Sequence, residues 1–253
     1  MKKIFCFLSL SALLWACDSG DDNTPYDPNA IQNTTLLKKL VETDDDNIMT
    51  TTDFHYDGYK INNITDSHNG SAVFTYAGNL ITKIEYYSGE TLTRTDLFTY
   101  NAAFKVSGHQ ALLHAEDYGT REAYTHNADG TVSYASFFGT VAQQNSPDLN
   151  GKIFFNNSGE VSRRETYLGS SVVSQETYEY DTWNHPLKNV IGLNEVLIYK
   201  GDTDGIRRNL LSTALTTNPR AITYQYSELS RFPVSSVSTS ALDGGISTQY
   251  YYE

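Results

Sequence analysis

The chain has 253 residues and a formal net charge of −12, with 30 acidic side chains against 18 basic ones. A surface this negative repels phosphate backbones, so we expect no nucleic-acid partner. The composition includes 19 tyrosines, and aromatic and β-branched side chains favour strands. The length suits one large β domain or two small ones.

The N-terminal 16 residues predict a cleaved signal peptide. Lys2 and Lys3 precede an apolar run over residues 4–15. A helix that spans a bilayer needs roughly 20 apolar residues, and this run is shorter. A positive start followed by a short apolar run is typical of a secretory leader, which we assign to residues 1–16.

The leader ends in a lipobox-like sequence. Leu14, Ala16 and Cys17 resemble the bacterial lipobox, and the resemblance implies cleavage before Cys17 and attachment of lipid to its thiol. The other cysteine, Cys6, would be lost with the leader. We therefore expect the membrane to be a partner through a lipid anchor on Cys17. A plain secretory leader with an incidental cysteine is the alternative.

An acidic tether follows the leader. Residues 17–35 are polar and have little to bury, so we expect them to be disordered. Asp18, Asp21 and Asp22 resemble the export signal of surface-exposed Bacteroidetes lipoproteins. An Asp directly after the cysteine resembles, instead, the inner-membrane retention signal of enterobacteria. We favour surface display because the acidic tract extends further, and an ordinary solvated tether is the third interpretation.

Residues 36–253 predict a single all-β domain built from a repeated hairpin. Its first segment, residues 35–42, could be a short helix or a strand, and we favour a strand. Most later units have two aromatic residues separated by one residue, which places both on one face of a strand. A Gly, Asn or Asp then supplies the tight turn. The aromatic pairs are Phe54/Tyr56, Phe74/Tyr76, Phe98/Tyr100, Tyr178/Tyr180 and Tyr224/Tyr226.

This pattern predicts an antiparallel meander of Tyr-rich hairpins forming a curved sheet. Tyr56-Asp57, and Tyr180-Asp181 followed by Trp183, resemble the YD repeats of the Rhs type, whose repeats form long curved β-sheets. The chain as a whole also resembles uncharacterised Bacteroidetes outer-membrane lipoproteins. That resemblance implies a lipid-anchored protein at the outer membrane, facing the cell surface. Several units lack Tyr-Asp or Gly, so neither an Rhs shell nor autoproteolysis is implied.

The segment 192–222 interrupts the repeat, and we expect a loop or a short helical insertion there. Irregular segments carry binding more often than repeats do. Asp202, Asp204 and Gly205 form a fragment of a calcium loop without its other ligands, so we interpret them as a polar turn. The acidic run 44–46 is interpreted as a solvated hairpin tip. No metal site is predicted.

The residues that could carry chemistry do not form a known motif. The six histidines lack zinc-site spacing, and no nucleophile elbow or phosphate-binding glycine loop is present. We predict no catalytic residues and no cofactor. Weak candidates for ligand contact are Trp183, Tyr180 and Tyr226, for which packing is the favoured interpretation.

These observations favour a non-catalytic binding or accessory subunit in an outer-membrane protein complex. One alternative is a glycan-binding module of a polysaccharide-uptake system, which predicts exposed coplanar aromatic rings. A hydrolase is a second, and it predicts a cleft with paired carboxylates or a Ser–His pair. A third is an envelope assembly factor that faces the periplasm.

Overall fold

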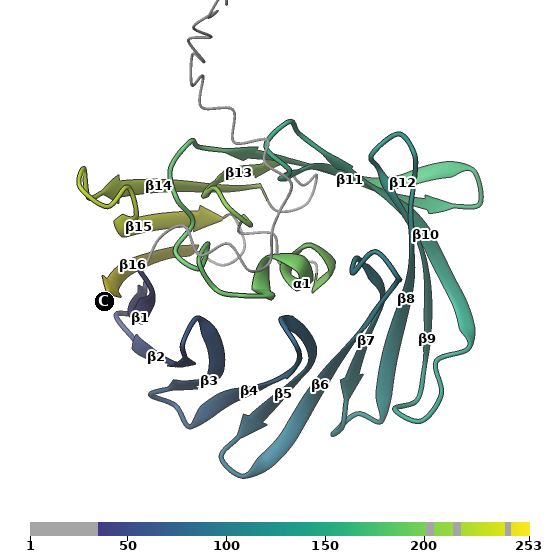
Figure 1. Cartoon of the computed structure of the whole chain (residues 1–253), viewed down its shortest axis with the longest axis horizontal. Coiled ribbons are helices and arrows are strands. Elements are labelled where there is room, and N and C mark those ends of the chain that lie inside the picture. The colour runs from purple at the N-terminus through teal and green to yellow at the C-terminus, as the bar shows by residue number, and fades with distance from the viewer. Residues whose placement is uncertain (1–34, 201–204, 215–218, 241–243) are drawn as a thin grey trace, which may run out of the picture.

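The chain folds into a closed barrel of sixteen antiparallel strands (Figure 1). The structure is a computed structural model, and it describes residues 35–200, 205–214, 219–240 and 244–253. One helix occurs in these residues, α1 Leu193–Lys200. The strands are β1 Leu37–Asp44, β2 Met49–Asp57, β3 Lys60–Asp66, β4 Gly70–Ala77, β5 Leu80–Ser88, β6 Thr91–Tyr100, β7 Val106–Leu113, β8 Tyr118–His126, β9 Val132–Gly139, β10 Ser146–Phe155, β11 Val161–Leu168, β12 Ser171–Tyr180, β13 Leu210–Ala214, β14 Arg220–Tyr226, β15 Pro233–Ser240 and β16 Gly244–Tyr252.

The first and last strands pair with each other, which closes the sheet into a ring. β1 lies between β2 and β16, so that Leu40 is flanked by Thr52 and Tyr250. We call the pairing of β1 with β16 the seam. At one end of the seam, Leu36 N donates to Glu253 O at 3.2 Å and Glu253 N donates to Leu36 O at 3.0 Å. The all-β antiparallel class and the first strand are confirmed. The meander does not form the curved sheet that was expected but closes into a barrel, in which each strand has two partners and the ring has no free edge.

The aromatic pairs mark β-bulges near the ends of strands. The register of pairing shifts directly before the second aromatic residue, and a bulge bends its strand and increases the local twist. Two of these tyrosines also bond the backbone 19 residues earlier, with Tyr56 Oη donating to Leu37 O at 2.7 Å and Tyr100 Oη to Ile81 O at 2.6 Å. Tyr252 of the last strand does the same, donating to Pro233 O at 2.9 Å. Bulges with this placement occur before Tyr56, Tyr76, Tyr100, Tyr180 and Tyr226.

The inward face of the ring carries the hydrophobic core. Alternate residues of each strand point into the lumen, where they meet one another and α1. Burying these apolar side chains is the main stabilising contribution, roughly 25 cal/mol for each Å² removed from water. Fully or almost fully buried members of this face are Ile61, Ile81, Ile84, Val106 and Ile153.

The outward face is polar in the middle of its strands. On β5, Lys83 Nζ lies 2.8 Å from Glu85 Oε2, on either side of the inward-facing Ile84. On β11, Arg163 Nε lies 3.0 Å from Glu165 Oε1. These ion pairs are partly exposed, so they contribute little to stability. They place charged side chains in the middle of the outer wall.

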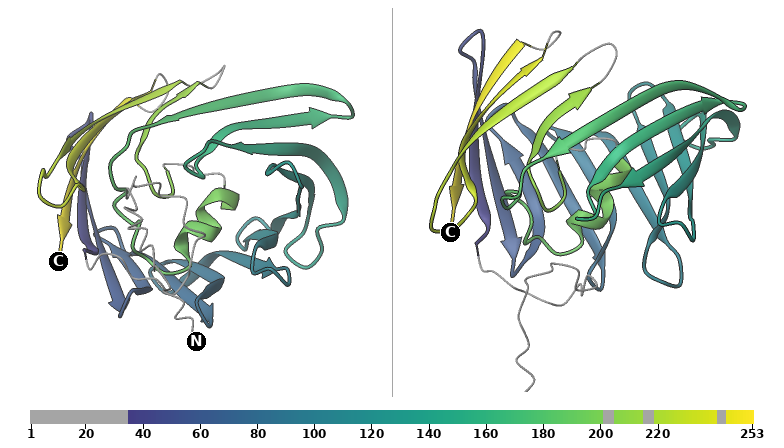
Figure 2. Two further views of the ribbon diagram at one scale, coloured as in Figure 1. Left: turned by 45° about the horizontal axis from the view of Figure 1, so that its top comes forward. Right: turned by 90° about the horizontal axis from the view of Figure 1, so that it is seen from above.

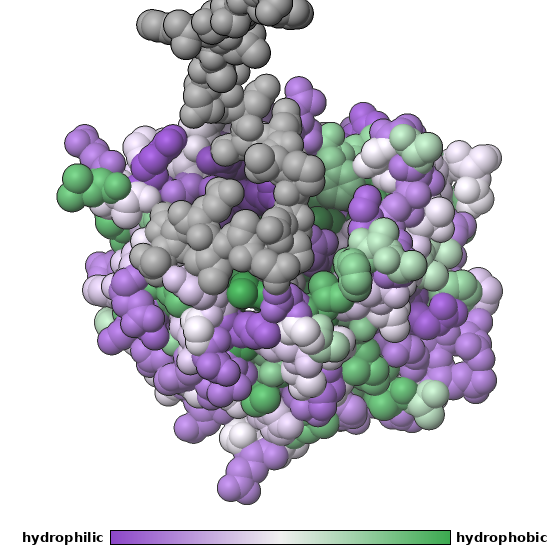
Figure 3. Space-filling model, in the orientation of Figure 1, coloured by the Kyte–Doolittle hydropathy of each residue, from purple (hydrophilic) through white to green (hydrophobic). Residues whose placement is uncertain are grey.

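Apolar side chains on the outer wall are separated by polar neighbours. Val237 pairs with Thr223 on one side and with Ser247 on the other. Val73 pairs with Glu85 across β4 and β5. The space-filling view looks onto one end of the barrel, where hydrophilic and hydrophobic residues are also interspersed (Figure 3). We find no continuous apolar band among the described strands.

The described part of the connection between β12 and β13, residues 181–200 and 205–209, enters the ring (Figure 2), and we call it the plug. Its helix α1 lies inside the ring (Figure 2). Before the helix begins, Ile191 N donates to Tyr59 O at 2.9 Å. Gly192 then crosses the β4–β5 turn with a φ of +77°, and a Cβ there would lie 2.5 Å from Asn79 O. Only glycine fits this crossing.

A buried carboxylate holds the returning arm of the plug. Glu160 is 0% exposed, and it accepts backbone N–H bonds from Ile206 at 2.9 Å, Arg207 at 2.7 Å and Arg208 at 2.8 Å. Burial raises the pKa of Glu160, although the three N–H donors oppose this effect. The plug is therefore attached to the barrel wall at both of its ends.

The segment 192–222 contains the short helix that was one of its two expected forms. It also contains β13 and the start of β14, which the sequence analysis missed, so the insertion is shorter than predicted. No helix in the described part of the chain is long and apolar enough to cross a membrane. Predicted positions that lie outside the described residues are Cys17, Asp18, Asp21, Asp22, Asp202 and Asp204.

Candidate functional site

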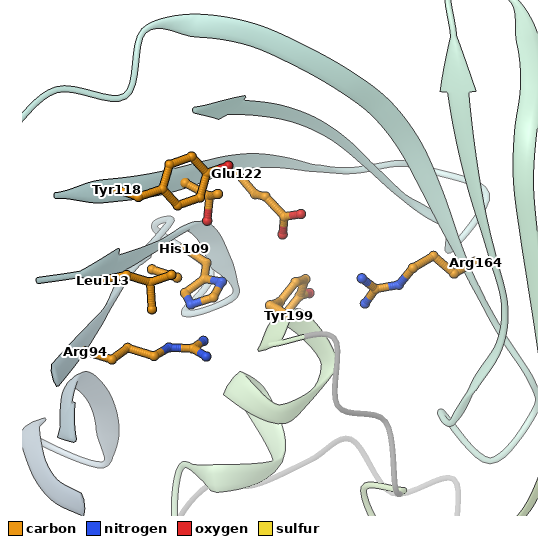
Figure 4. Close-up of a pocket in the computed structure, with 9 residues that line it drawn as sticks. Arg94, His109, Leu113, Tyr118, Glu122, Arg164 and Tyr199 are labelled. Atoms are coloured by element: carbon orange, nitrogen blue, oxygen red, sulfur yellow. The ribbon is translucent and has the colours of Figure 1, made fainter. Parts of the chain in front are cut away.

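The lumen contains a cavity of about 280 Å³ next to the plug. Side chains from β6, β7, β8 and β11 form its wall, and α1 contributes the side nearest the plug (Figure 4). A concave site with a few convergent polar groups is the usual form of a small-molecule site. The charged and aromatic residues of the lining are Arg94, His109, Tyr118, Glu122, Arg164 and Tyr199.

We call the end of the barrel at which Leu36 and Glu253 meet the seam end. The cavity extends toward the opposite end of the barrel. β1 begins at the end where Leu36 and Glu253 meet, and successive strands alternate in direction. The seventh strand therefore ends, and the eighth begins, at the opposite end. Leu113 and Tyr118 occupy these two positions, and both line the cavity. The plug leaves β12 at the seam end, so it closes the barrel on that side.

One side of the cavity is built on a buried ionic network. Asp96 is 0% exposed, and its Oδ1 accepts a hydrogen bond from Arg94 Nε at 2.8 Å. Tyr86 Oη donates to Oδ2 at 3.2 Å, and His109 Nε2 lies 3.5 Å from Oδ1. Burial raises the pKa of Asp96, but bonds and charges from His109 and Arg94 outweigh it and hold the pKa below its ordinary value. Phe98 stacks on the His109 ring at 4.8 Å.

The other side joins a carboxylate, a guanidinium and the end of α1. Glu122 accepts a short hydrogen bond from Tyr124 Oη. Arg164 Nη2 donates to Ile198 O at 2.8 Å, which places a cation at the negative end of the helix. Glu122 and Arg164 point toward each other in the cavity (Figure 4), but neither forms an ion pair with a described residue.

The aromatic side of the cavity is Tyr199, the penultimate residue of α1. Its ring centroid lies 4.4 Å from that of Tyr124 and 6.4 Å from that of His126. Tyr124 Oη also donates to Tyr199 O at 3.3 Å. Burial, with a smaller effect from Glu195, raises the pKa of Tyr199. Its hydroxyl is therefore protonated at neutral pH and can both donate and accept.

The chemistry of this lining suits binding. Its hydroxyls belong to Thr120 and two tyrosines, and it contains neither Ser nor Cys. The carboxylate beside His109 is Asp96, which is fully buried and already bonded. No hydrogen bond in the described structure joins one of these hydroxyls to His109 or Glu122. The described residues also contain no group of three His, Cys, Asp or Glu side chains that could hold a metal ion.

The residues predicted for ligand contact lie at the seam end, away from the cavity. The structure brings Trp183 and Tyr226 together in a ring stack with centroids 4.7 Å apart and an interplanar angle of 13°. Arg231 lies 5.4 Å from the Trp183 ring, and Tyr226 Oη donates to Asp181 in a short bond. Tyr180 is separate and packs against the core. These contacts fit the packing interpretation.

The cavity residues were missed because they come from five elements. A signal for them exists in single strands: a charged residue two positions before a core aromatic residue shares its face. Asp96 precedes Phe98 in this way, and Glu122 precedes Tyr124. Both acidic residues face the lumen, where an apolar residue would be expected. A charged residue at a strand position that faces the core therefore indicates the cavity wall.

Comparisons with known proteins show the fold alone. No family model matches the chain, and no curated protein matches it. Among solved structures, a porin-like protein from Bacteroides uniformis ATCC 8492 is similar, with a TM-score of 0.53 and 10% identity. The similarity covers 90% of this chain and 99% of that one.

Proposed function

We propose that this chain is a lipid-anchored outer-membrane lipoprotein whose barrel stands in water and binds a small polar ligand in its lumen. The observation that carries the binding role is the cavity, in which Arg94, Glu122 and Arg164 converge beside Tyr199. The lining supplies hydrogen-bond donors, acceptors and charges that suit a polar ligand. The role we propose is that of a non-catalytic binding or accessory subunit.

The polar outer wall supports a barrel outside the bilayer. A membrane barrel has an apolar band facing lipid and a polar interior. Here the interior is apolar except at the charged wall of the cavity, and Lys83 and Arg163 lie mid-strand on the outside with their acidic partners. A basic residue at the bilayer midplane costs about 2–4 kcal/mol, so such a wall is unfavourable in lipid. Its plug is also attached at both ends, which does not suit a pore.

The position of the anchor supports access to the cavity from solution. The tether that begins at Cys17 joins the barrel at Thr35, beside the seam. The cavity extends toward the opposite end, where Leu113 and Tyr118 lie. With lipid on Cys17, the plugged end would face the membrane. The acidic signal Asp18, Asp21 and Asp22 favours display on the cell surface, where glycans are available ligands.

A protease site inserted between residues 25 and 34 tests the placement of the barrel. We expect digestion of isolated membranes to release the barrel into the supernatant without detergent, because the lipid is its attachment. Wild-type membranes treated in the same way are the control. A cleaved barrel that still sediments with the membranes would contradict the proposal and favour a membrane-spanning, porin-like role.

The same variant tests the side of the membrane. Protease added to intact cells reaches the tether only if the protein faces outward, so we expect release before lysis. Release that occurs only after lysis would contradict surface display and favour the periplasm-facing assembly factor. An internal periplasmic protein that stays intact before lysis is the control for cell integrity.

A further inference from the structure

We propose that the lumen cavity binds one uncharged sugar ring, through its hydroxyls and through its apolar C–H face. The proposal rests on the binding function above and specifies the ligand. Three features of the lining carry it: its arginines already lie beside carboxylates, two charged groups face each other without touching, and one tyrosine at the edge of the cavity has an uncommitted side chain. A free sugar and the terminal sugar of a glycan share this chemistry.

Each arginine of the lining already lies beside a carboxylate. Arg94 Nε donates to the fully buried Asp96 at 2.8 Å. Arg164 faces Glu122 across the cavity (Figure 4), and it is the register partner of Glu176 on the neighbouring strand. A charged ligand would leave water without gaining an opposite charge that lacks a neighbour, so its desolvation would be poorly compensated. The lining therefore favours an uncharged ligand.

Glu122 and Arg164 leave a space between them that a hydroxyl group can fill. They point toward each other (Figure 4), but they form no ion pair in the described structure. Glu122 accepts one hydrogen bond, from Tyr124 Oη, and a carboxylate has about four acceptor sites. Arg164 Nε is buried and has no hydrogen-bond partner among the described residues. A hydroxyl can donate to the carboxylate and accept from the guanidinium at once, without changing the charge of the site.

Tyr118 supplies an aromatic surface at the edge of the cavity. Tyr118, Thr120 and Glu122 alternate along β8, so they share its inward face, and all three line the cavity. Tyr118 is 40% exposed, and its side chain forms no hydrogen bond, ring contact or cation–π contact with the described residues. A sugar ring has an apolar face of C–H bonds and a rim of hydroxyls. Its apolar face can pack on the Tyr118 ring while a hydroxyl reaches Glu122 on the same strand.

The size and position of the cavity limit the ligand. About 280 Å³ lies at the lower end of ordinary ligand sites, which suits one sugar ring and not a chain of them. The cavity extends to Leu113 and Tyr118 at the end of the barrel opposite the seam end, where Tyr118 is in contact with solvent. A free hexose can enter there, and so can the last ring of a glycan whose remaining rings stay outside.

Saturation-transfer NMR of the full chain, in a zwitterionic detergent that contains no sugar, tests the ligand class. The probes form two series of equal ring size: D-glucose, D-glucuronate and D-glucosamine, and D-galactose, D-galacturonate and D-galactosamine. We expect at least one neutral hexose to bind with a Kd of about 1 mM or tighter. Its uronate and its amino sugar should bind at least about tenfold more weakly, because their charges find no unpaired partner.

The outcomes of this titration separate the ligand class from the binding function. A uronate or an amino sugar that binds as tightly as its parent hexose, or more tightly, would overturn the uncharged ligand and leave the binding function standing. No saturation transfer to any of these probes at about 10 mM would overturn both proposals.

Substitution of Tyr118 tests the aromatic contact. Tyr118→Ala should weaken binding of the hexose by about fivefold or more, whereas Tyr118→Phe, which keeps the ring, should stay within about twofold of the wild type. Tyr251→Ala is the matched control, because Tyr251 is a similarly exposed tyrosine (46%) on the outer wall. Equal losses for Y118A and Y251A would overturn the site.

Glu122→Gln tests the charge balance by a change of preference, which a loss of packing would not produce. Without this carboxylate, Arg164 is less compensated, so the affinity for the uronate relative to its parent hexose should rise at least about fivefold. Glu179→Gln, which removes an exposed charge that bonds Ser212, is the matched control and should leave the ratio unchanged. An unchanged ratio in E122Q would overturn the argument from compensated charges. Circular dichroism before each titration checks that the variants are folded.

Methyl glycosides of the hexose that binds best distinguish the two sources. A terminal sugar carries a substituent on its anomeric oxygen, so one of the methyl α- and β-glycosides should then bind as tightly as the free hexose. For a free sugar the anomeric hydroxyl lies inside the cavity, and both glycosides should bind at least about tenfold more weakly.

Discussion

At the scale of single residues, the lumen wall contains charged groups at positions that share a face with the core. Asp96 is 0% exposed, and it is tolerated because Arg94 and Tyr86 bond its two oxygens. A buried charge whose partner is removed is strongly destabilising. Asp96 therefore contributes to the stability of the barrel as well as to the orientation of Arg94.

Asp96→Asn should make the barrel less stable and less dependent on pH. The pKa of Asp96 lies below its ordinary value of 3.8 in the folded protein. Its stabilising contribution is therefore complete above that value and is lost as the pH falls through the folded pKa. We expect the free energy of unfolding to fall by about 3 kcal/mol at pH 7 and by less at pH 2. Urea titrations at both pH values measure this.

The control for this experiment is Asp53→Asn, a substitution on the outer wall of β2. It should change the free energy of unfolding by less than about 0.5 kcal/mol. A D96N variant that loses the same stability at pH 2 as at pH 7 would contradict the role of the ionised carboxylate.

Tyr100→Phe should remove one bond of the repeat without disturbing packing. Tyr100 Oη donates to Ile81 O at 2.6 Å in a half-buried position. Loss of this bond should lower the free energy of unfolding by about 1 kcal/mol. Tyr251→Phe is the matched control, because its hydroxyl bonds Gln249 on the exposed wall. Thermal or urea unfolding measures both, and equal effects would count against a structural role for the repeated hydroxyl.

At the scale of elements, the plug is a connection between two strands that is fixed to the wall at several points. Its first arm bonds Tyr59 through Ile191, and its second arm is held by Glu160. α1 has only eight residues, which is too short to be stable alone. The helix therefore depends on these attachments and on the Arg164 contact at its end.

Glu160→Ala should loosen the second arm of the plug. Three backbone N–H groups, from Ile206, Arg207 and Arg208, would lose their acceptor in a buried place. We expect a loss of about 3 kcal/mol in the free energy of unfolding and faster hydrogen exchange at these amides. Glu179→Ala, which removes an exposed acceptor of Ser212, is the control. Unchanged exchange at residues 206–208 would refute this account of the plug.

How far the elements could be predicted depends on the range of the interaction. The hairpins are local, so the aromatic pairs such as Phe54 and Tyr56 predict strand, bulge and turn together. Closure depends on pairing between Leu40 and Tyr250, which no local pattern encodes. For the same reason the cavity could not be assembled from the sequence. Asp202 and Asp204, and the N-terminal signal, stay predictions.

At the scale of the whole molecule, the distribution of polarity is the reverse of that in a membrane barrel. The lumen packs apolar side chains around the plug except at the charged wall of the cavity, and the outer wall alternates charged and small polar residues with single apolar ones. This distribution supports the proposal that water surrounds the barrel, since apolar surface is buried where water is excluded. The lipid anchor we propose would then be the main attachment to the membrane.

Val237→Lys tests whether the outer wall of the barrel contacts water. Val237 is 47% exposed on β15 between Thr223 and Ser247, so a lysine there should remain in water. We expect the free energy of unfolding to change by less than about 0.5 kcal/mol. The inward Ile153→Lys should prevent folding, because it buries an unpaired charge. Circular dichroism and urea unfolding measure both. A loss of several kcal/mol for V237K would indicate a lipid-facing wall.

The seam between β1 and β16 also has a consequence for how the chain folds. Every other strand pair joins neighbours in the chain, whereas Leu40 must meet Tyr250 across the whole domain. Local hairpins form first because their loops are short, and ring closure comes last. Until β16 is made, β1 has an unpaired edge that can capture a strand of another copy. Loss of β16 alone would thus leave the other hairpins intact and convert a closed monomer into a chain that associates edge to edge.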